Sequence, residues 1–132
     1  MSETFGGDRG SSRNRLGNVA ERIAAEFAGG MTDEVARRLR VLGHPTRVAL
    51  VIELAAGSRS VAALAVATGL DPAVASKHLR ELQRASIVQR RQDGTHAIYA
   101  LADATALKVL LLVARTARAD AARITAALRA AS

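Results

Sequence analysis

Apolar residues recur at helical spacing over most of the chain, beginning after a polar N-terminal stretch. Residues 1–14 combine Gly, Ser and charged side chains with one aromatic residue, Phe5. This composition predicts a disordered tail, because so little apolar surface cannot offset the entropy of ordering it. From Leu16 to Phe27, apolar positions three and four residues apart predict an amphipathic helix that stops at the following Gly-Gly pair. The predicted organisation is a tail over 1–14 and a single domain over 15–132.

Two helices follow, and the second is expected to lie at the centre of the core. Thr32 can cap the first of them, whose apolar stripe is predicted to be buried and consists of Val35, Leu39 and Leu42. The next helix begins at Pro45 and is apolar on nearly every side until Gly57 ends it. A helix that is apolar all round is typical of a buried core element.

The middle of the chain predicts a helix-turn-helix. Ser60 is expected to cap a short helix over 61–68, and Gly69 supplies the turn after it. Asp71 is expected to cap a second helix that runs from Pro72 to about Arg84, with the proline in its first turn. Two helices joined by so tight a turn are a common DNA-binding arrangement.

A β-hairpin and a long helix complete the predicted elements. Short strands over 87–91 and 96–101 flank the sequence Gln-Asp-Gly-Thr, in which Asp-Gly is a strong turn signal. Asp103 is then expected to cap a helix that runs to about Arg129. Its apolar residues alternate spacings of three and four without a break, which predicts a seam for pairing with another helix.

The charge of the chain favours a polyanionic partner. Lys and Arg number 19 against 12 Asp and Glu, which gives a net charge of +7. The absence of Cys excludes disulfides, thiolate metal sites and thiol-based redox sensing. Aromatic residues make up 2% of the chain, which argues against base stacking on an aromatic platform. With no apolar segment for secretion or for spanning a membrane in the sequence, we expect a cytoplasmic protein with no membrane partner.

The order of these elements is that of a winged helix-turn-helix. From about Glu34 to Leu112 the sequence resembles the ArsR/SmtB family of dimeric bacterial transcriptional repressors. The most telling segments are Gly43-His44-Pro45-Thr46-Arg47, Ser76-Lys77-His78-Leu79, and Arg90-Arg91-Gln92-Asp93-Gly94 with Tyr99 in the second strand. The resemblance implies a mainly α fold with a small β-hairpin, a dimer formed through the N-terminal and C-terminal helices, and binding to double-stranded DNA, associated with the bacterial nucleoid.

The second helix of the helix-turn-helix is the predicted recognition helix. Helical periodicity turns its polar side toward a major groove, while Ala75, Leu79 and Leu82 face inward. The chain departs from the family in its first turn, where Pro72, Ala73 and Val74 offer only apolar contacts. Hydrogen-bond readout therefore falls to the residues that follow. The predicted DNA contacts on this helix are Ala73, Val74, Ser76, Lys77, His78 and Arg80; for His78, packing between the helices is an equally good interpretation.

The hairpin is the predicted wing, which binds flanking phosphates or the minor groove. Its predicted contacts are Arg90 and Arg91 before the turn and Thr95 and His96 after it. Arg47 is a candidate phosphate contact, with pairing to Glu53 or Glu81 as the alternative. Tyr99 is interpreted as a structural residue of the second strand.

No metal and no cofactor are expected. Metal sensors of the family use Cys on the first helix of the helix-turn-helix or Asp, His and Glu on the last helix, and this chain has neither set. Its three His lie in a loop, on the recognition helix and on the wing. Two alternatives stay open for regulation: a small apolar or anionic effector, or no ligand and control by protein level or a protein partner.

A homodimer is predicted through the two terminal helices. For the N-terminal helix, covering its own core is the alternative. The predicted interface residues are Leu16, Val19, Ile23, Phe27, Leu107, Leu110, Ala114, Ala117, Ala121, Ile124 and Leu128.

The sequence thus predicts a dimeric, sequence-specific DNA-binding regulator that represses transcription at an inverted-repeat operator. A low-specificity architectural DNA-binding protein and a winged-helix protein-interaction module are the alternatives. Neither a phosphate-binding loop nor a recognisable nucleophile motif is present, so no enzyme is predicted.

Overall fold

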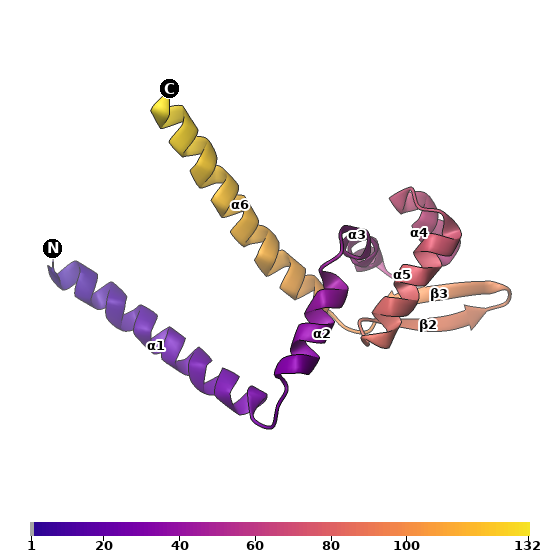
Figure 1. Ribbon diagram of the computed structural model, residues 1–132, viewed down its shortest axis with the longest axis horizontal. Helices are drawn as coiled ribbons and strands as arrows, with labels where there is room; N and C mark the ends of the chain where they lie inside the picture. Colours follow the sequence, from indigo (N-terminus) through magenta and orange to yellow (C-terminus); the bar gives the residue numbers. More distant parts are fainter. Residues whose placement is uncertain (1) are drawn as a thin grey trace. The chain divides into compact units, whose positions relative to one another are not determined.

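A computed structural model describes residues 2–132, with side chains described from residue 15 on. It divides into two compact units, one ending at Arg37 and one beginning at Arg38 (Figure 1). The second unit contains the helix-turn-helix, the sheet and the last helix.

The first unit contains the helix α1 (Ser2–Phe27). Gly29 and Gly30, with φ of 88° and 91°, form the turn that ends it, and the Gly30 N–H donates to the Phe27 carbonyl oxygen at 3.4 Å. The predicted end of this helix is confirmed, whereas its start lies before the predicted Leu16. Met1 and the side chains of residues 1–14 lie outside the described part, so the disordered tail expected there stays a prediction.

The helix α2 (Thr32–Leu42) has the predicted cap residue Thr32 as its first helical residue, and it ends before Gly43, whose N–H donates to the Leu39 carbonyl oxygen at 2.9 Å. None of its residues is buried, and Leu39 is 51% exposed. The prediction of a buried stripe over Val35, Leu39 and Leu42 is therefore wrong for Leu39. Contact with the core is made near the C-terminal end of α2, where Val41 and Leu42 are partly buried.

The helix α3 (Pro45–Glu53) and the short 3-10 turn η1 (Leu54–Ala56) supply the centre of the core, as predicted. Leu50, Val51 and Leu54 are buried there against residues from the helix-turn-helix, the hairpin and the last helix. One side of α3 still faces solvent, since Ile52 is 55% exposed. The other buried members of this cluster are Leu64, Leu79, Leu82, Val88, Tyr99 and Ala106.

The helix-turn-helix is confirmed at the predicted residues. In α4 (Val61–Thr68), the Ser60 hydroxyl oxygen accepts a hydrogen bond from the Ala63 N–H at 3.1 Å. Gly69 ends α4 in the left-handed conformation, with φ of 71°, which favours glycine at this turn. The recognition helix α5 (Pro72–Arg84) then begins with proline at its first position.

The sheet has three antiparallel strands in the order β1-β3-β2, formed by β1 (Arg59–Ser60), β2 (Val88–Asp93) and β3 (His96–Leu101). The sequence does not predict β1, because a strand of two residues carries no periodicity. The hairpin loop is also shorter than predicted: Asp93 pairs with His96, so the loop is Gly94-Thr95. Gly94, the first residue of the loop, has φ of 60°, whereas the second, Thr95, does not have positive φ, because the one such non-glycine residue of the described chain is Ser86. A positive φ at the first loop residue alone is the pattern of a type II′ turn.

The last helix, α6 (Thr105–Ala131), begins two residues after its predicted cap. The Asp103 carboxylate nevertheless accepts a hydrogen bond from the Thr105 N–H at 2.8 Å. This bond holds the pKa of the Asp103 carboxyl below its usual range. Ala106 is buried and Leu107 and Leu110 pack on the core, whereas every residue from Leu111 to the end is exposed within the described chain.

No helix within residues 2–132 combines the length and the uninterrupted apolar sequence of a membrane span.

Candidate nucleic-acid interface

The recognition helix α5 is fixed to the rest of its unit by its apolar face and by its first turn. Ala75, Leu79 and Leu82 have no exposed surface. At the N-terminus, the Asp71 carboxylate accepts a hydrogen bond from the Ala73 N–H at 2.8 Å. A helix held in this way presents its remaining side chains in a defined orientation, as a base-reading element requires.

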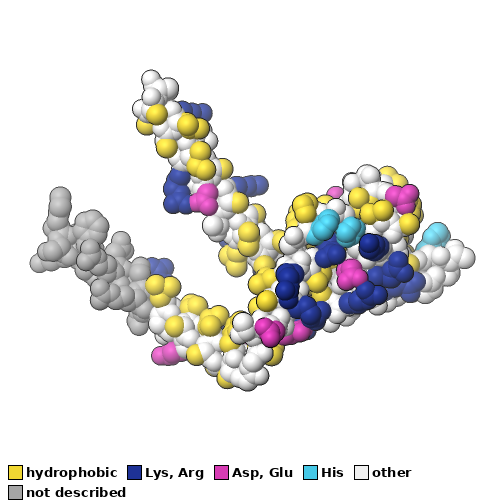
Figure 2. All heavy atoms as spheres, in the orientation of Figure 1, with side chains coloured by type: hydrophobic (Ala, Val, Ile, Leu, Met, Phe, Trp, Pro, Cys, Tyr) yellow, Lys and Arg dark blue, Asp and Glu magenta, His cyan; other side chains and the backbone are white. Residues whose placement is uncertain are grey.

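The solvent side of α5 carries the residues that the sequence assigned to DNA. Lys77 and Arg80 are exposed, and Ser76 and His78 are half-buried. In the first turn Ala73 is exposed and the apolar Val74 is 43% exposed. Figure 2 shows Lys and Arg side chains gathered over α5 and the hairpin on one face of the molecule. The structure thus combines an apolar first turn with a cationic second turn.

His78 and Arg47 form a contact that the sequence did not predict. The Arg47 Nε donates to His78 Nδ1 at 3.2 Å, and its Nη1 donates to the Val41 carbonyl oxygen at 3.3 Å. The predicted alternative for Arg47, a carboxylate partner, is not seen among the described side chains: Glu53 pairs with Arg59 at 2.6 Å, and Glu81 pairs with Arg84. The expectation that the His residues are scattered is corrected for His44, whose ring centroid lies 4.7 Å from that of His78.

The surroundings of His78 favour its neutral form. Burial is the largest cause of a lowered imidazole pKa, followed by electrostatic interactions with His44, Arg47 and Lys77. Glu81 acts in the opposite direction but does not cancel them. The neutral form is also the one whose Nδ1 can accept the hydrogen bond from Arg47.

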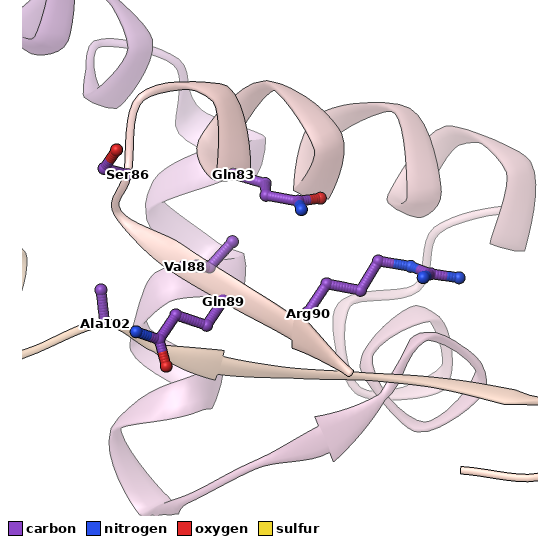
Figure 3. A pocket seen from close by; sticks show the side chains of 6 residues that line it. All are labelled: Gln83, Ser86, Val88, Gln89, Arg90 and Ala102. Carbon is purple, nitrogen blue, oxygen red and sulfur yellow. The ribbon is translucent and has the colours of Figure 1, made fainter. Parts of the chain in front are cut away.

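The two wing arginines lie on opposite faces of the hairpin. Arg90 pairs across the ladder with the buried Tyr99, whereas Arg91 pairs with Ile98. Figure 3 shows Val88 and Arg90 on the α5 side of β2 and Gln89 pointing away from it, in an open pocket at the start of the strand. The Arg90 Nη2 donates to Gln92 Oε1 at 2.8 Å. Because side chains alternate along a strand, a single flat surface cannot engage both arginines equally.

The tip of the wing lies beside the N-terminal halves of both helices of the helix-turn-helix. One shallow pocket is lined by Ser60 and Ala62 from the start of α4, by Pro72 and Ser76 from α5, and by Thr95, His96 and Ala97 from the hairpin, together with Val61. The structure therefore brings three predicted contacts, Ser76, Thr95 and His96, to one place. Ser60 joins them and was not predicted as a contact; its cap signal identified it only as the start of a helix.

The buried position of Tyr99 bears out its interpretation as a structural residue, since it is 1% exposed and belongs to the core.

The predicted dimer residues lie on both terminal helices and are described here within each unit. On α1, Leu16, Val19 and Ile23 are exposed and Phe27 is half-buried. On α6, Leu107 and Leu110 are partly covered by the core of their own unit. The seam residues that remain fully available to another chain are Ala114, Ala117, Ala121, Ile124 and Leu128.

Metal binding is not indicated by the described side chains, from residue 15 on, where no three His, Asp or Glu are grouped as a metal site requires. The two neighbouring His rings both use Nδ1 as an acceptor, since His44 Nδ1 accepts from the Thr46 N–H at 3.2 Å.

Comparison with known proteins also identifies the helix-turn-helix region of the chain. A family described as a helix-turn-helix domain matches residues 38–91. The chain is 30% identical over 93 residues to the biofilm growth-associated repressor of Xylella fastidiosa, covering 70% of this chain and 82% of that protein. It is 34% identical over 83 residues to an HTH-type transcriptional regulator of Mycobacterium tuberculosis, covering 63% of this chain. The chain spans 37% of the length of that second relative.

Solved structures show a similar fold. A homodimeric winged helix-turn-helix DNA-binding domain from Mycobacterium bovis, described as a possible ArsR-family transcriptional regulator, is 33% identical with a TM-score of 0.61. The similarity covers 67% of this chain and 82% of that domain.

Proposed function

The chain belongs to the ArsR/SmtB family of winged helix-turn-helix transcriptional regulators, and we propose that it is a dimeric, sequence-specific DNA-binding repressor acting at an inverted-repeat operator. In this proposal it acts in the bacterial cytoplasm, associated with the nucleoid when bound, and has no catalytic role.

The observation that carries the proposal is the meeting of helix and wing at one surface. Ser76 of α5 lines the same pocket as Thr95 and His96 of the hairpin. Lys77 and Arg80 are exposed on the same helix. A duplex laid over this surface would have the recognition helix in its major groove and the wing on the adjacent backbone.

In this proposal some side chains contact base edges and others bind phosphates. Lys77 is the long donor available to reach a guanine edge, and the first-turn residues Ala73 and Val74 contact a thymine methyl group. Arg90, Arg91 and the hydroxyl of Ser60 neutralise or hydrogen-bond phosphates. With so few base-reading donors, a large share of the affinity comes from phosphates and DNA shape, and binding is steeply dependent on salt.

Dimerisation is proposed through the exposed part of the α6 seam together with the apolar face of α1. An apolar helix face that its own unit leaves in solvent favours burial against a second chain. A twofold dimer places its two recognition helices on half-sites about 34–36 Å apart, or a multiple of that distance.

The test is fluorescence anisotropy of the purified protein on a duplex from upstream of its own gene and on a scrambled duplex, at about 150 mM salt. A preference of about a thousandfold or more for the upstream duplex supports a specific repressor. If that duplex gives no preference, duplexes selected from a random pool repeat the comparison before specificity is rejected.

An architectural DNA-binding protein is the second candidate, favoured by the apolar first turn of α5. Near-equal affinities for the selected and scrambled duplexes would support it. No binding to any duplex would instead favour docking of a protein partner on the winged helix.

A further inference from the structure

Arg47, His78 and His44 form a cluster where the start of α3 meets the recognition helix. Arg47 and the His44 cap belong to the start of α3, and His78 lies in the middle of α5. We propose that Arg47 is a positioning residue that holds the recognition helix through His78, and that protonation of His78 releases this hold and lowers the specificity of DNA binding. This inference rests on the proposed DNA-binding function.

The hydrogen bonds of Arg47 argue against a free phosphate-binding role. Its side chain is half-buried, its Nε is directed to His78 Nδ1, and its Nη1 is directed to the Val41 carbonyl oxygen. One side chain thereby joins the end of α2, the start of α3 and the middle of α5. The next residue along α5 from His78 is the fully buried Leu79, and the residue before it is Lys77, a predicted base contact. In this proposal, a displacement at His78 also shifts the neighbouring Lys77 on the base-reading side of α5.

The contact requires a neutral imidazole. Arg47 is always a donor, so the Nδ1 of His78 must carry a lone pair and the ring proton must lie on Nε2. A protonated ring has a donor at both nitrogens and cannot accept from Arg47. Protonation would also add a positive charge beside Arg47 and Lys77, with His44 packed against the ring and Glu81 acting in the opposite direction.

The direction of the pH effect follows from this geometry. The contact is complete at a pH well above the ordinary imidazole pKa of 6.5, and it is lost as the pH falls through the lowered pKa of His78 in the folded protein. Loss of one hydrogen bond corresponds to a change of about three- to tenfold in an equilibrium constant. We expect a change of this size in the ratio of affinities for selected and scrambled DNA.

The ratio of affinities for selected and scrambled DNA distinguishes an effect on the position of the recognition helix from an effect of added charge. A protonated His78 adds positive charge that attracts every duplex, which raises both affinities and leaves their ratio unchanged. A displaced recognition helix instead lowers the affinity for the selected duplex alone. The wing residue His96 is a second imidazole at the candidate interface, so all proteins compared carry His96→Gln.

The first experiment needs no DNA. Long-range proton–nitrogen NMR spectra of the imidazole rings give the tautomer and the pKa of His78 in the free protein. We expect the proton on Nε2, a pKa below 6.5, and a higher pKa in Arg47→Gln, which removes the guanidinium and its positive charge. A proton on Nδ1, or a pKa that Arg47→Gln leaves unchanged, would overturn the proposal even if DNA binding is confirmed.

The second experiment measures anisotropy on selected and scrambled duplexes at constant ionic strength, from pH 8 down to about one pH unit below the pKa of His78 that NMR gives. The matched variant is His78→Asn, whose amide oxygen can occupy the position of Nδ1 and cannot be protonated in this range. We expect the affinity ratio to fall about three- to tenfold on acidification in the parent protein and to stay constant in His78→Asn. A ratio that falls equally in both proteins would assign the effect to another group and overturn the role of His78.

Thermal unfolding of each variant at pH 8 controls for loss of fold. If no duplex is bound specifically at any pH, the proposed function fails, while the NMR titration still decides whether Arg47 holds a neutral His78.

Discussion

Arg91→Ala gives the sharpest test of the wing. The Arg91 side chain is exposed and, within the described chain, makes no hydrogen bond or ion pair, so its removal should leave folding unchanged. Each phosphate contact that is lost lowers the slope of log K against log salt by about 0.9. For a twofold dimer with one such contact per protomer, we expect a slope lower by about 2 and, at about 150 mM salt, binding weaker by roughly thirtyfold. The loss should be the same on selected and scrambled DNA, because phosphates carry no sequence information.

Anisotropy titrations at five or more salt concentrations measure both quantities. Arg123→Ala is the matched control, since it removes the same charge from an exposed position on α6, where Arg123 pairs with Asp120 outside the candidate interface. We expect it to change the slope by less than about half a unit. An unchanged slope for Arg91→Ala would refute the wing contact, whereas an equal decrease for Arg123→Ala would show that net charge acts here rather than a wing contact.

Four further predictions concern readout, assembly and stability. Lys77→Ala should lose about 1–3 kcal/mol on selected DNA and much less on scrambled DNA, and equal losses would contradict base readout. Ala117→Asp puts a charge in the exposed part of the α6 seam, so sedimentation velocity should show a monomer with weakened DNA binding; an intact dimer would refute this interface. Leu79→Ala, at a position without exposed surface, should lower the urea-unfolding free energy by about 2–5 kcal/mol. Asp103→Ala should lose stability relative to the parent above about pH 4 and converge with it as the pH falls, because the lowered pKa of Asp103 means that its bond to Thr105 stabilises the fold only while it is ionised.

The structure also changes which dimer variant is informative. Leu110 belongs to the same predicted seam as Ala117, yet it packs on the core of its own unit. A charge at Leu110 would destabilise the monomer as well, and its effect could not be assigned to assembly. Ala117 is exposed, so its substitution reports on contacts with another chain alone.

Local signals explain why the helix-turn-helix could be predicted from sequence. Its boundaries depend on Ser60, Gly69 and Asp71, and each acts on backbone atoms within three or four residues of itself. The sign of φ at Gly69 and the oxygen at each cap need no knowledge of the rest of the fold. The candidate DNA contacts on α5 follow from the same boundaries, because the helix start fixes which residues share its solvent side.

Pairing between distant segments explains what could not be predicted. The strand β1 exists because Arg59 and Ser60 pair with Tyr99 and Ile98, almost forty residues away along the chain. The predicted hairpin loop held four residues, from Gln92 to Thr95, whereas the observed pairing of Asp93 with His96 extends the first strand and leaves a loop of Gly94-Thr95. For β1, the decisive hydrogen bonds join residues too far apart along the chain for any short window of sequence to relate them.

The hydrogen-bond partner of Arg47 could not be predicted either, because it depends on how the neighbouring charged residues are paired. The sequence offered it Glu53 or Glu81, and a carboxylate is ordinarily the stronger partner for a guanidinium. Each carboxylate is bonded to a different arginine: Glu53 to Arg59, and Glu81 to Arg84 one turn further along α5. With both acids engaged, Arg47 bonds to an imidazole instead, and a titratable contact replaces an ion pair that would have persisted down to acidic pH. The pH sensitivity proposed for the recognition helix therefore follows from how the neighbouring charges are paired, a property of the packed unit rather than of any motif in the chain.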